Sequence, residues 1–162
     1  MATRSTIALE YADGTVEQVY CHWDGYLNNN GRILLENWSD PFKLQQLIDL
    51  GDLSILSNEI GEKHDFDNPN KWGTEEYDNW RRQHANWCFF YGRDRGEEGV
   101  EKSKYENYQQ YLKTGQQEEY NYILRQIDGK AVWFVAYYKT NDRFVKLEWA
   151  IAEQIREEEE VE

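Results

Sequence analysis

One short stretch near the N-terminus holds side chains that could do chemistry, because Cys21, His22, Trp23, Asp24 and Tyr26 lie close together. A cysteine and a histidine are ligands that zinc accepts, and a histidine near an aspartate can act as an acid/base pair. The aromatic rings offer faces on which a nucleotide base can stack. The same residues also suit a strand that runs into a turn, so each interpretation has to be weighed.

Metal binding needs three or four ligands that converge on one ion. Consecutive side chains of a strand point to opposite faces, so Cys21 and His22 cannot both bind the same ion. The other candidates, His64, His84 and Cys88, are spread along the chain and form no C-x-x-C or H-E-x-x-H motif. We therefore expect no metal and no cofactor, and we expect both cysteines to be small buried hydrophobic residues.

Catalysis by these residues is a weaker prediction than a structural role. Nothing around Cys21 resembles a nucleophile elbow. His22, Asp24, Asp65 and Asp67 could act as general acids or bases in a pocket, but Asp24-Gly25 and Asp67-Asn68-Pro69 are strong turn-forming sequences on their own. A small hydrolase that uses His22 or Asp24 is therefore the third hypothesis, and the main prediction is that the protein is not an enzyme.

A second candidate site is the sequence YGRDRGE at residues 91–97. It lacks the Lys-Ser/Thr ending of a P-loop, but it places two arginines in a glycine-flanked turn. Arginine forks suit phosphates, and tyrosine or tryptophan faces suit bases, so the alternative hypothesis is a protein that binds a nucleotide signal. In the simpler interpretation the arginines pair with neighbouring acids and close a loop. The residues of this predicted pocket are Arg4, His22, Trp23, Asp24, Tyr26, Tyr91, Arg93, Asp94, Arg95 and Glu97.

The net charge of −13 is spread along the chain, although the last ten residues alone hold −5. Such a charge repels nucleic acid and anionic membranes, so neither is an expected partner. Carboxylates on a rigid scaffold, with exposed tyrosines and tryptophans among them, can instead occupy the basic groove of a protein that binds nucleic acid. The leading hypothesis is therefore a protein that binds such a host protein. The predicted acidic surface comprises Glu75, Glu76, Asp78, Glu118, Glu119, Glu153, Glu157, Glu158, Glu159 and Glu160.

The elements that position these residues are predicted from periodicity and turn signals. Two hairpins turn at Asp-Gly pairs, one formed by strands 5–11 and 16–23 and the other by strands 118–126 and 131–138. In the first hairpin, alternation puts Val19, Cys21 and Trp23 on the core side and His22 on a polar rim with Tyr26. A third, aromatic strand at residues 86–93 is expected at the centre of the sheet.

Helices are predicted between and after these strands. The pattern indicates helices at 31–38, at 39–51 with Asp40 as cap and Phe42, Leu44, Leu47 and Ile48 inward, at 74–84, at 103–115, and at 141–160 with Asp142 as cap. Residues 52–60 suit a helical turn or a strand, residues 61–85 a polar loop or insertion, and residues 157–162 a frayed acidic tail. Together they predict an α+β fold with a mainly antiparallel sheet of about five strands and about four helices, in one domain spanning residues 1–162.

The size and hydropathy of the chain agree with a protein of the cytoplasm. The mean hydropathy is −0.96, no run approaches the roughly 20 apolar residues of a membrane span, and the first residues have no apolar signal core. Two cysteines are too few for a disulfide scaffold.

Several motifs along the chain occur in a consistent order: TRSTI at 3–7, DGTV at 13–16, YCHWDGY at 20–26, GRILL at 31–35, LIDLGDLS at 47–54, HDFDNP at 64–69, YGRDRGE at 91–97 and EYNY at 119–122. With these motifs the chain resembles a family of small proteins encoded by tailed phages and by some bacterial genomes. The resemblance covers most of the chain, and the tract 70–87 departs from it as an insertion. It implies a phage-associated accessory protein and no particular reaction. Together with the acidic surface, the leading hypothesis is a counter-defence or host-takeover protein in the cytoplasm of a bacterial host.

Overall fold

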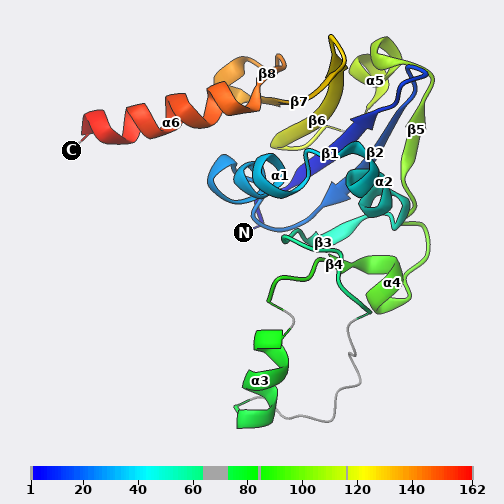
Figure 1. Cartoon of the computed structure of the whole chain (residues 1–162), viewed down its shortest axis with the longest axis vertical. Helices are drawn as coiled ribbons and strands as arrows, with labels where there is room; N and C mark the ends of the chain where they lie inside the picture. Colours follow the sequence, from blue (N-terminus) through cyan, green and yellow to red (C-terminus); the bar gives the residue numbers. More distant parts are fainter. Residues whose placement is uncertain (1, 64–72, 84, 116, 162) are drawn as a thin grey trace.

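The computed structural model describes residues 2–63, 73–83, 85–115 and 117–161, and these form an α+β fold around one mixed sheet (Figure 1). The strands are β1 (Ser5–Glu10), β2 (Val16–Cys21), β3 (Leu53–Ile55), β4 (Phe89–Phe90), β5 (Ser103–Tyr105), β6 (Tyr120–Ile127), β7 (Lys130–Tyr137) and β8 (Val145–Lys146). The helices are α1 (Arg32–Asn37), α2 (Pro41–Asp49), α3 (Glu75–Gln83), α4 (Tyr91–Arg95), α5 (Tyr108–Thr114) and α6 (Leu147–Val161).

The strand order is β4-β3-β2-β1-β6-β7-β8, and β5 pairs with β2 beside this path. The expected fold class is correct, but the described part of the chain has eight strands and six α-helices rather than about five and four. The sheet is also mixed rather than mainly antiparallel, because β1 pairs in parallel with β6 and β2 in parallel with β3. Both parallel pairs join strands that are separated by helices, and local patterns do not reveal such pairings.

Both predicted hairpins are confirmed. In the first, Ile7 pairs with Val19, and the Asp13 carboxylate accepts bonds from the backbone N–H and the hydroxyl of Thr15. In the second, Asp128 and Gly129 both have positive φ, 52° and 79°, as a two-residue turn between twisted strands requires. The strongest turn signals in the sequence therefore predicted the two hairpins of the sheet correctly.

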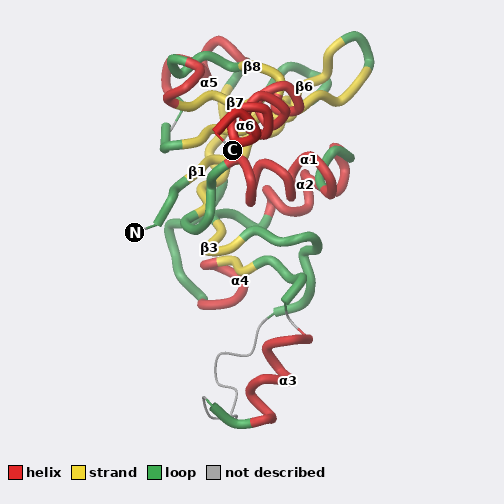
Figure 2. Tube along the Cα trace, turned by 90° about the vertical axis from the view of Figure 1, so that its left-hand side faces the viewer, coloured by secondary structure: helices red, strands yellow, loops and turns green. Residues whose placement is uncertain are grey.

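The first face of the sheet is covered by α1, α2 and α6 and holds the main apolar core (Figures 1 and 2). Leu47 of α2 and Ile151 of α6 are buried there, as predicted. Asp40 caps α2 by accepting a bond from the N–H of Phe42, also as predicted. The inward placement of Phe42 is wrong, since its side chain is 78% exposed. At about 100° per residue, Phe42 lies on the side of the helix opposite to Leu44.

The second face of the sheet carries a smaller cluster under the short helix α5. Tyr111 of α5 packs there on Ala8, Val16 and Ile123. This face also buries polar side chains, which must be hydrogen-bonded. The buried polar residues of this face are Thr6, Gln18 and Asn121. The Thr6 hydroxyl donates to the Asn121 amide oxygen at 2.8 Å, and Gln18 accepts a bond from the Tyr105 hydroxyl at 3.0 Å.

The predicted central strand at residues 86–93 is wrong. Only Phe89 and Phe90 form a strand, β4, which pairs with β3 at one end of the sheet, and Trp87 makes an isolated bridge to Glu59. The chain then turns directly into α4, which ends at Gly96 with φ of 68°. The YGRDRGE segment is therefore largely a short helix and not an open turn.

Two further helix boundaries differ from the prediction. Residues 103–105 form β5, and α5 begins only after Asn107, whose side chain accepts a bond from the N–H of Gln110. The closing helix begins at Leu147, because residues 145–146 pair with β7 as β8. Asp142 is thus not a helix cap, and its backbone has a positive φ of 58°.

Helix α3 stands apart from the sheet, at the opposite end of the molecule from α6 (Figures 1 and 2). It lies within the segment 61–85 that was predicted as a polar loop or insertion; residues 64–72 and 84 of that segment lie outside the described residues. The four glutamates 157–160 and Val161 are part of α6 rather than a frayed tail. None of the helices in the described residues is long and apolar enough to cross a membrane.

Candidate binding surfaces

Arg93, the central residue of the predicted nucleotide pocket, is committed to protein oxygens. Its guanidinium donates to the Asp94 carboxylate at 3.0 and 3.2 Å and to the backbone oxygens of Ile60, Gly61 and Cys88 at 3.0 to 3.2 Å. A guanidinium has five N–H donors, and these bonds use all of them. In this structure Arg93 therefore has no N–H left to donate to a phosphate, and the residue ties three segments together.

The neighbours of Arg93 follow the simpler interpretation of the YGRDRGE segment. Asp94 is buried and also accepts a bond from the N–H of Phe90 at 2.7 Å, so it closes the start of α4. Arg95 is exposed, lies 3.7 Å from the Glu97 carboxylate and sits over the Tyr91 ring at 5.6 Å. Exposed pairs of this kind contribute little stability, and Arg95 is held only loosely.

Part of the predicted pocket does gather, but around a residue that the prediction omitted. Tyr20 projects from the second face at the end of β2, and its hydroxyl is hydrogen-bonded to Nδ1 of His22 at 2.6 Å. Burial raises the pKa of Tyr20, Arg4 lowers it, and Tyr91 raises it. Arg4 and Tyr91 therefore both lie near the Tyr20 ring. The alternation of β2 could have identified Tyr20, since it shares a face with His22.

Trp23 does not face the core, contrary to the prediction, and is 42% exposed. Strand β2 ends at Cys21, and the left-handed conformation of Asp24, with φ of 56°, interrupts the alternation on which the prediction rested. The Trp23 ring meets the His22 ring edge to face at 4.8 Å. Tyr26 is exposed on the rim, as expected.

Both thiols are buried, as predicted. Burial raises the pKa of Cys21 to about 11 and that of Cys88 to about 12. Since the thiolate is the nucleophile and the metal ligand, neither cysteine is activated near neutral pH. Within the described residues, no three histidine, cysteine or carboxylate side chains are grouped to hold a metal ion.

The predicted acidic surface is divided between the two ends of the molecule. Glu75, Glu76 and Asp78 are exposed in the first turn of α3, far from α6 (Figure 1). The glutamates Glu157–Glu160 are exposed in the last turns of α6. The structure therefore shows two acidic helices rather than one acidic surface.

The acidic end of α6 is continuous with aromatic and acidic residues of the neighbouring strands. Lys139 bridges to Glu157 at 2.9 Å, which places the turn after β7 beside the helix. Burial raises the pKa of Tyr120 and of Tyr137, and nearby Glu119 and Glu157 respectively add to it; the two rings stack at 5.0 Å. Glu118 instead lies near Tyr20, whose pKa it raises, and so borders the second face.

Two exposed aromatic residues complete this region, and the prediction named neither of them. Tyr138 is 69% exposed beside Lys139, and Trp149 is 55% exposed on the outer side of α6. Helical spacing could have identified Trp149, since it precedes Glu153 by four residues and lies opposite to the buried Ile151. We call Glu119, Tyr138, Trp149, Glu153 and Glu157–Glu160 the α6 surface.

Comparisons of the chain with known protein families, with curated proteins and with solved structures found no match.

Proposed function

We propose that this is a non-enzymatic binding protein that uses the α6 surface to occupy the basic, nucleic-acid-binding groove of a host protein. The observation that carries the proposal is the position of four successive glutamates at the C-terminal end of α6. A helix C-terminus carries partial negative charge, so four carboxylates there are unfavourable to the helix dipole, and their only local cations are Lys139 beside Glu157 and Arg156 beside Glu160 among the described residues. Binding to a basic partner would explain why four glutamates are placed at this end of the helix.

The way in which α6 is anchored supports this proposal. Leu147, Ala150 and Ile151 fix its first half in the core, and its last turns continue outward (Figure 1). Helix α6 contains six acidic residues and one basic residue, Arg156, which pairs with Glu153 at 2.7 Å and with Glu160 at 2.9 Å. A rigid row of carboxylates loses little conformational entropy when it enters a groove.

Trp149 supports a protein partner in particular. Exposed tryptophan and tyrosine side chains act as anchors in protein interfaces because they bury a large area with few rotatable bonds. The resemblance to phage-encoded proteins supplies the biological setting of the proposal, a counter-defence or host-takeover role in the bacterial host cytoplasm. The nucleotide-signal alternative has less support, because Arg93 is unavailable and Arg95 is only loosely held on the surface.

The test removes three charges from either acidic helix. One variant carries Glu158→Gln, Glu159→Gln and Glu160→Gln, and the matched control carries Glu75→Gln, Glu76→Gln and Asp78→Asn. Proteins retained from a host lysate by the wild type are identified by mass spectrometry, and the association rate of the purified partner is measured over a salt series. We expect the α6 variant to associate more slowly and the α3 variant to match the wild type.

Salt and nucleic acid provide the second readout. The association rate should fall steeply as the screening length shrinks from about 10 Å at 0.1 M salt to about 3 Å at 1 M. Duplex DNA or RNA should compete for the partner. A partner that binds equally well in high salt with its nucleic acid still attached would refute the proposal.

A further inference from the structure

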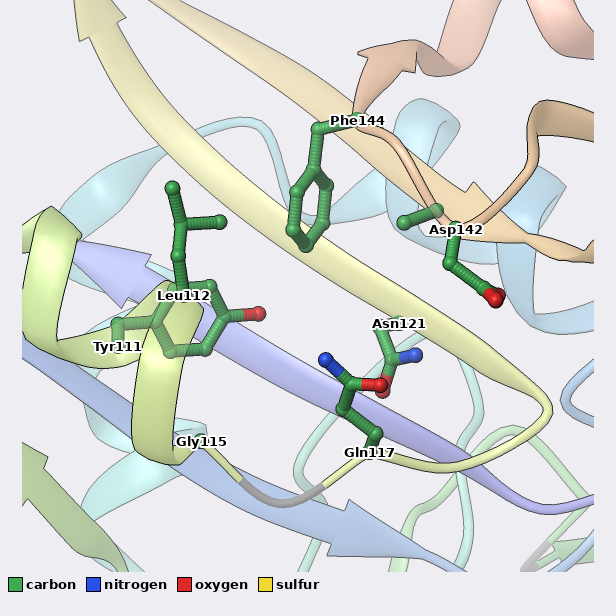
Figure 3. Close-up of a pocket in the computed structure, with 8 residues that line it drawn as sticks. Tyr111, Leu112, Gly115, Gln117, Asn121, Asp142 and Phe144 are labelled. Carbon is green, nitrogen blue, oxygen red and sulfur yellow. The ribbon is translucent and has the colours of Figure 1, made fainter.

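The second face of the sheet contains a cavity that the proposed function does not use. It lies between the C-terminal end of α5, the strands β6 and β7 and the turn before β8 (Figure 3). Its volume is about 70 Å³, which is enough for a few atoms but not for a nucleotide. The lining residues are Tyr111, Leu112, Gly115, Gln117, Asn121, Ala136, Asp142 and Phe144.

The walls of the cavity are aromatic. The ring centroids of Tyr111 and Phe144 are 6.0 Å apart with their planes inclined at 38°. The Tyr111 ring and the Phe144 ring lie on one side of the space and the side-chain amides of Gln117 and Asn121 on the other, while the Tyr111 hydroxyl is hydrogen-bonded to Gln18 (Figure 3). An aromatic face carries negative charge density, which attracts cations.

The floor is held rigidly by Asn121. Its side-chain oxygen accepts bonds from the Thr6 hydroxyl and from the N–H of Glu118, and its side-chain nitrogen donates to the Glu118 carbonyl at 3.0 Å. Asn121 is buried, so its orientation is fixed by these partners. The floor is therefore formed in advance of any ligand.

The rim carries a negative charge. Among the described residues that line the cavity, Asp142 alone is ionisable to an anion near neutral pH, and no lysine or arginine lines it. The N–H of Asp142 donates to the Tyr137 carbonyl at 3.0 Å, and the residue is exposed. An anionic ligand would meet repulsion here and no compensating cation.

We propose that this cavity binds the guanidinium group of an arginine side chain presented by a partner protein. A guanidinium is flat enough to lie against the Tyr111 and Phe144 rings and has donors for the Asp142 carboxylate and the Gln117 amide oxygen. A compact ammonium makes fewer of these contacts at once and is more strongly hydrated. The cavity lies on the other face of the sheet from the anchored part of α6, so the inference holds or fails independently of the α6 surface.

The test uses n-butylguanidinium chloride as the probe and N-butylurea, a neutral molecule of nearly the same shape, as its control. Each is titrated into the full-length protein, and the shifts of the side-chain amides of Asn121 and Gln117 are followed by NMR. We expect saturable shifts with the guanidinium and binding weaker by at least about fivefold with the urea, as loss of a charge-assisted hydrogen bond predicts. Equal binding of both compounds would refute the inference.

Matched variants assign the effect to the rim. Asp142→Asn removes the charge, and asparagine tolerates the left-handed conformation, so the fold should be kept. The control is Asp128→Asn, because Asp128 is also exposed with a positive φ, 52°, but lies in the distant hairpin turn. Guanidinium binding should weaken about fivefold in the first variant and stay unchanged in the second. Equal binding by both variants, or no shift in the wild type, would show that the cavity is only a packing gap.

Discussion

Helices α3 and α6 both expose acidic side chains, α3 at its N-terminal end and α6 at its C-terminal end. In α3, Glu75, Glu76 and Asp78 occupy the first turn, where the helix dipole is positive and favours them. In α6, the glutamates 157–160 occupy the C-terminal end, where the dipole is negative. The helix dipole therefore accounts for the acids of α3, whereas it disfavours those of α6, which have ion pairs with Lys139 and Arg156 to offset it.

The two helices also differ in how they are attached. Helix α6 contributes Leu147, Ala150 and Ile151 to the core, whereas none of the α3 residues whose burial the structure describes belongs to it. An acidic helix that is fixed to a rigid sheet can present its charges in a defined geometry. This difference is the reason for assigning binding to α6 and only a local structural role to the acids of α3.

The anchoring of α6 predicts the largest effect. Ile151→Ala should lower the free energy of unfolding by about 2–5 kcal/mol, as expected when a buried side chain leaves a cavity. Leu47→Ala in α2 should fall in the same range, because it packs in the same core. Denaturant melts measure both. A loss near zero for Ile151→Ala would mean that α6 is not docked on the sheet, and the contrast with α3 would disappear.

The outer side of the same helix should behave in the opposite way. Trp149 is 55% exposed, so Trp149→Ala should leave the melting curve nearly unchanged. Binding to the captured partner should weaken about tenfold or more, because truncated aromatic anchors commonly have this effect. Equilibrium titration with the purified partner measures the change. Phe42→Ala is the matched control, since Phe42 is also an exposed aromatic residue but lies on α2.

The centre of the fold could be predicted from sequence because its signals are local. Asp13-Gly14 and Asp128-Gly129 mark turns, and the spacing of Leu44, Leu47 and Ile48 marks a helical face. The short strands β3, β4, β5 and β8 have two or three residues each and leave no periodic pattern. Their pairing depends on partners far away in the sequence, which is why the sheet was predicted to be smaller and mainly antiparallel.

The candidate site shows the same limit. The sequence shows that Arg93 has five donors, but not that the carbonyls of Ile60, Gly61 and Cys88 surround it. Those carbonyls come from segments whose approach is set by the tertiary fold. The approach of Arg4, His22 and Tyr91 to Tyr20 was predicted in part. Arg4, Tyr20 and His22 lie at the ends of the first hairpin, whose strands the alternation identified.

The smallest predicted effect tests the dipole argument itself with one substitution in each helix. Glu75→Gln removes a charge from the first turn of α3, and Glu159→Gln removes one from the end of α6. The first should weaken its helix and the second should strengthen it, each by about 0.3 kcal/mol at low salt, because the two carboxylates face dipole ends of opposite sign. Glu159 suits the comparison because no ion pair or hydrogen bond ties its side chain to another described residue. Amide hydrogen exchange in the two helices measures local opening, and high salt should remove both effects. If Glu159→Gln also weakened its helix, the glutamates of α6 would be stabilising where they stand, and the main reason to look for a basic partner would be lost.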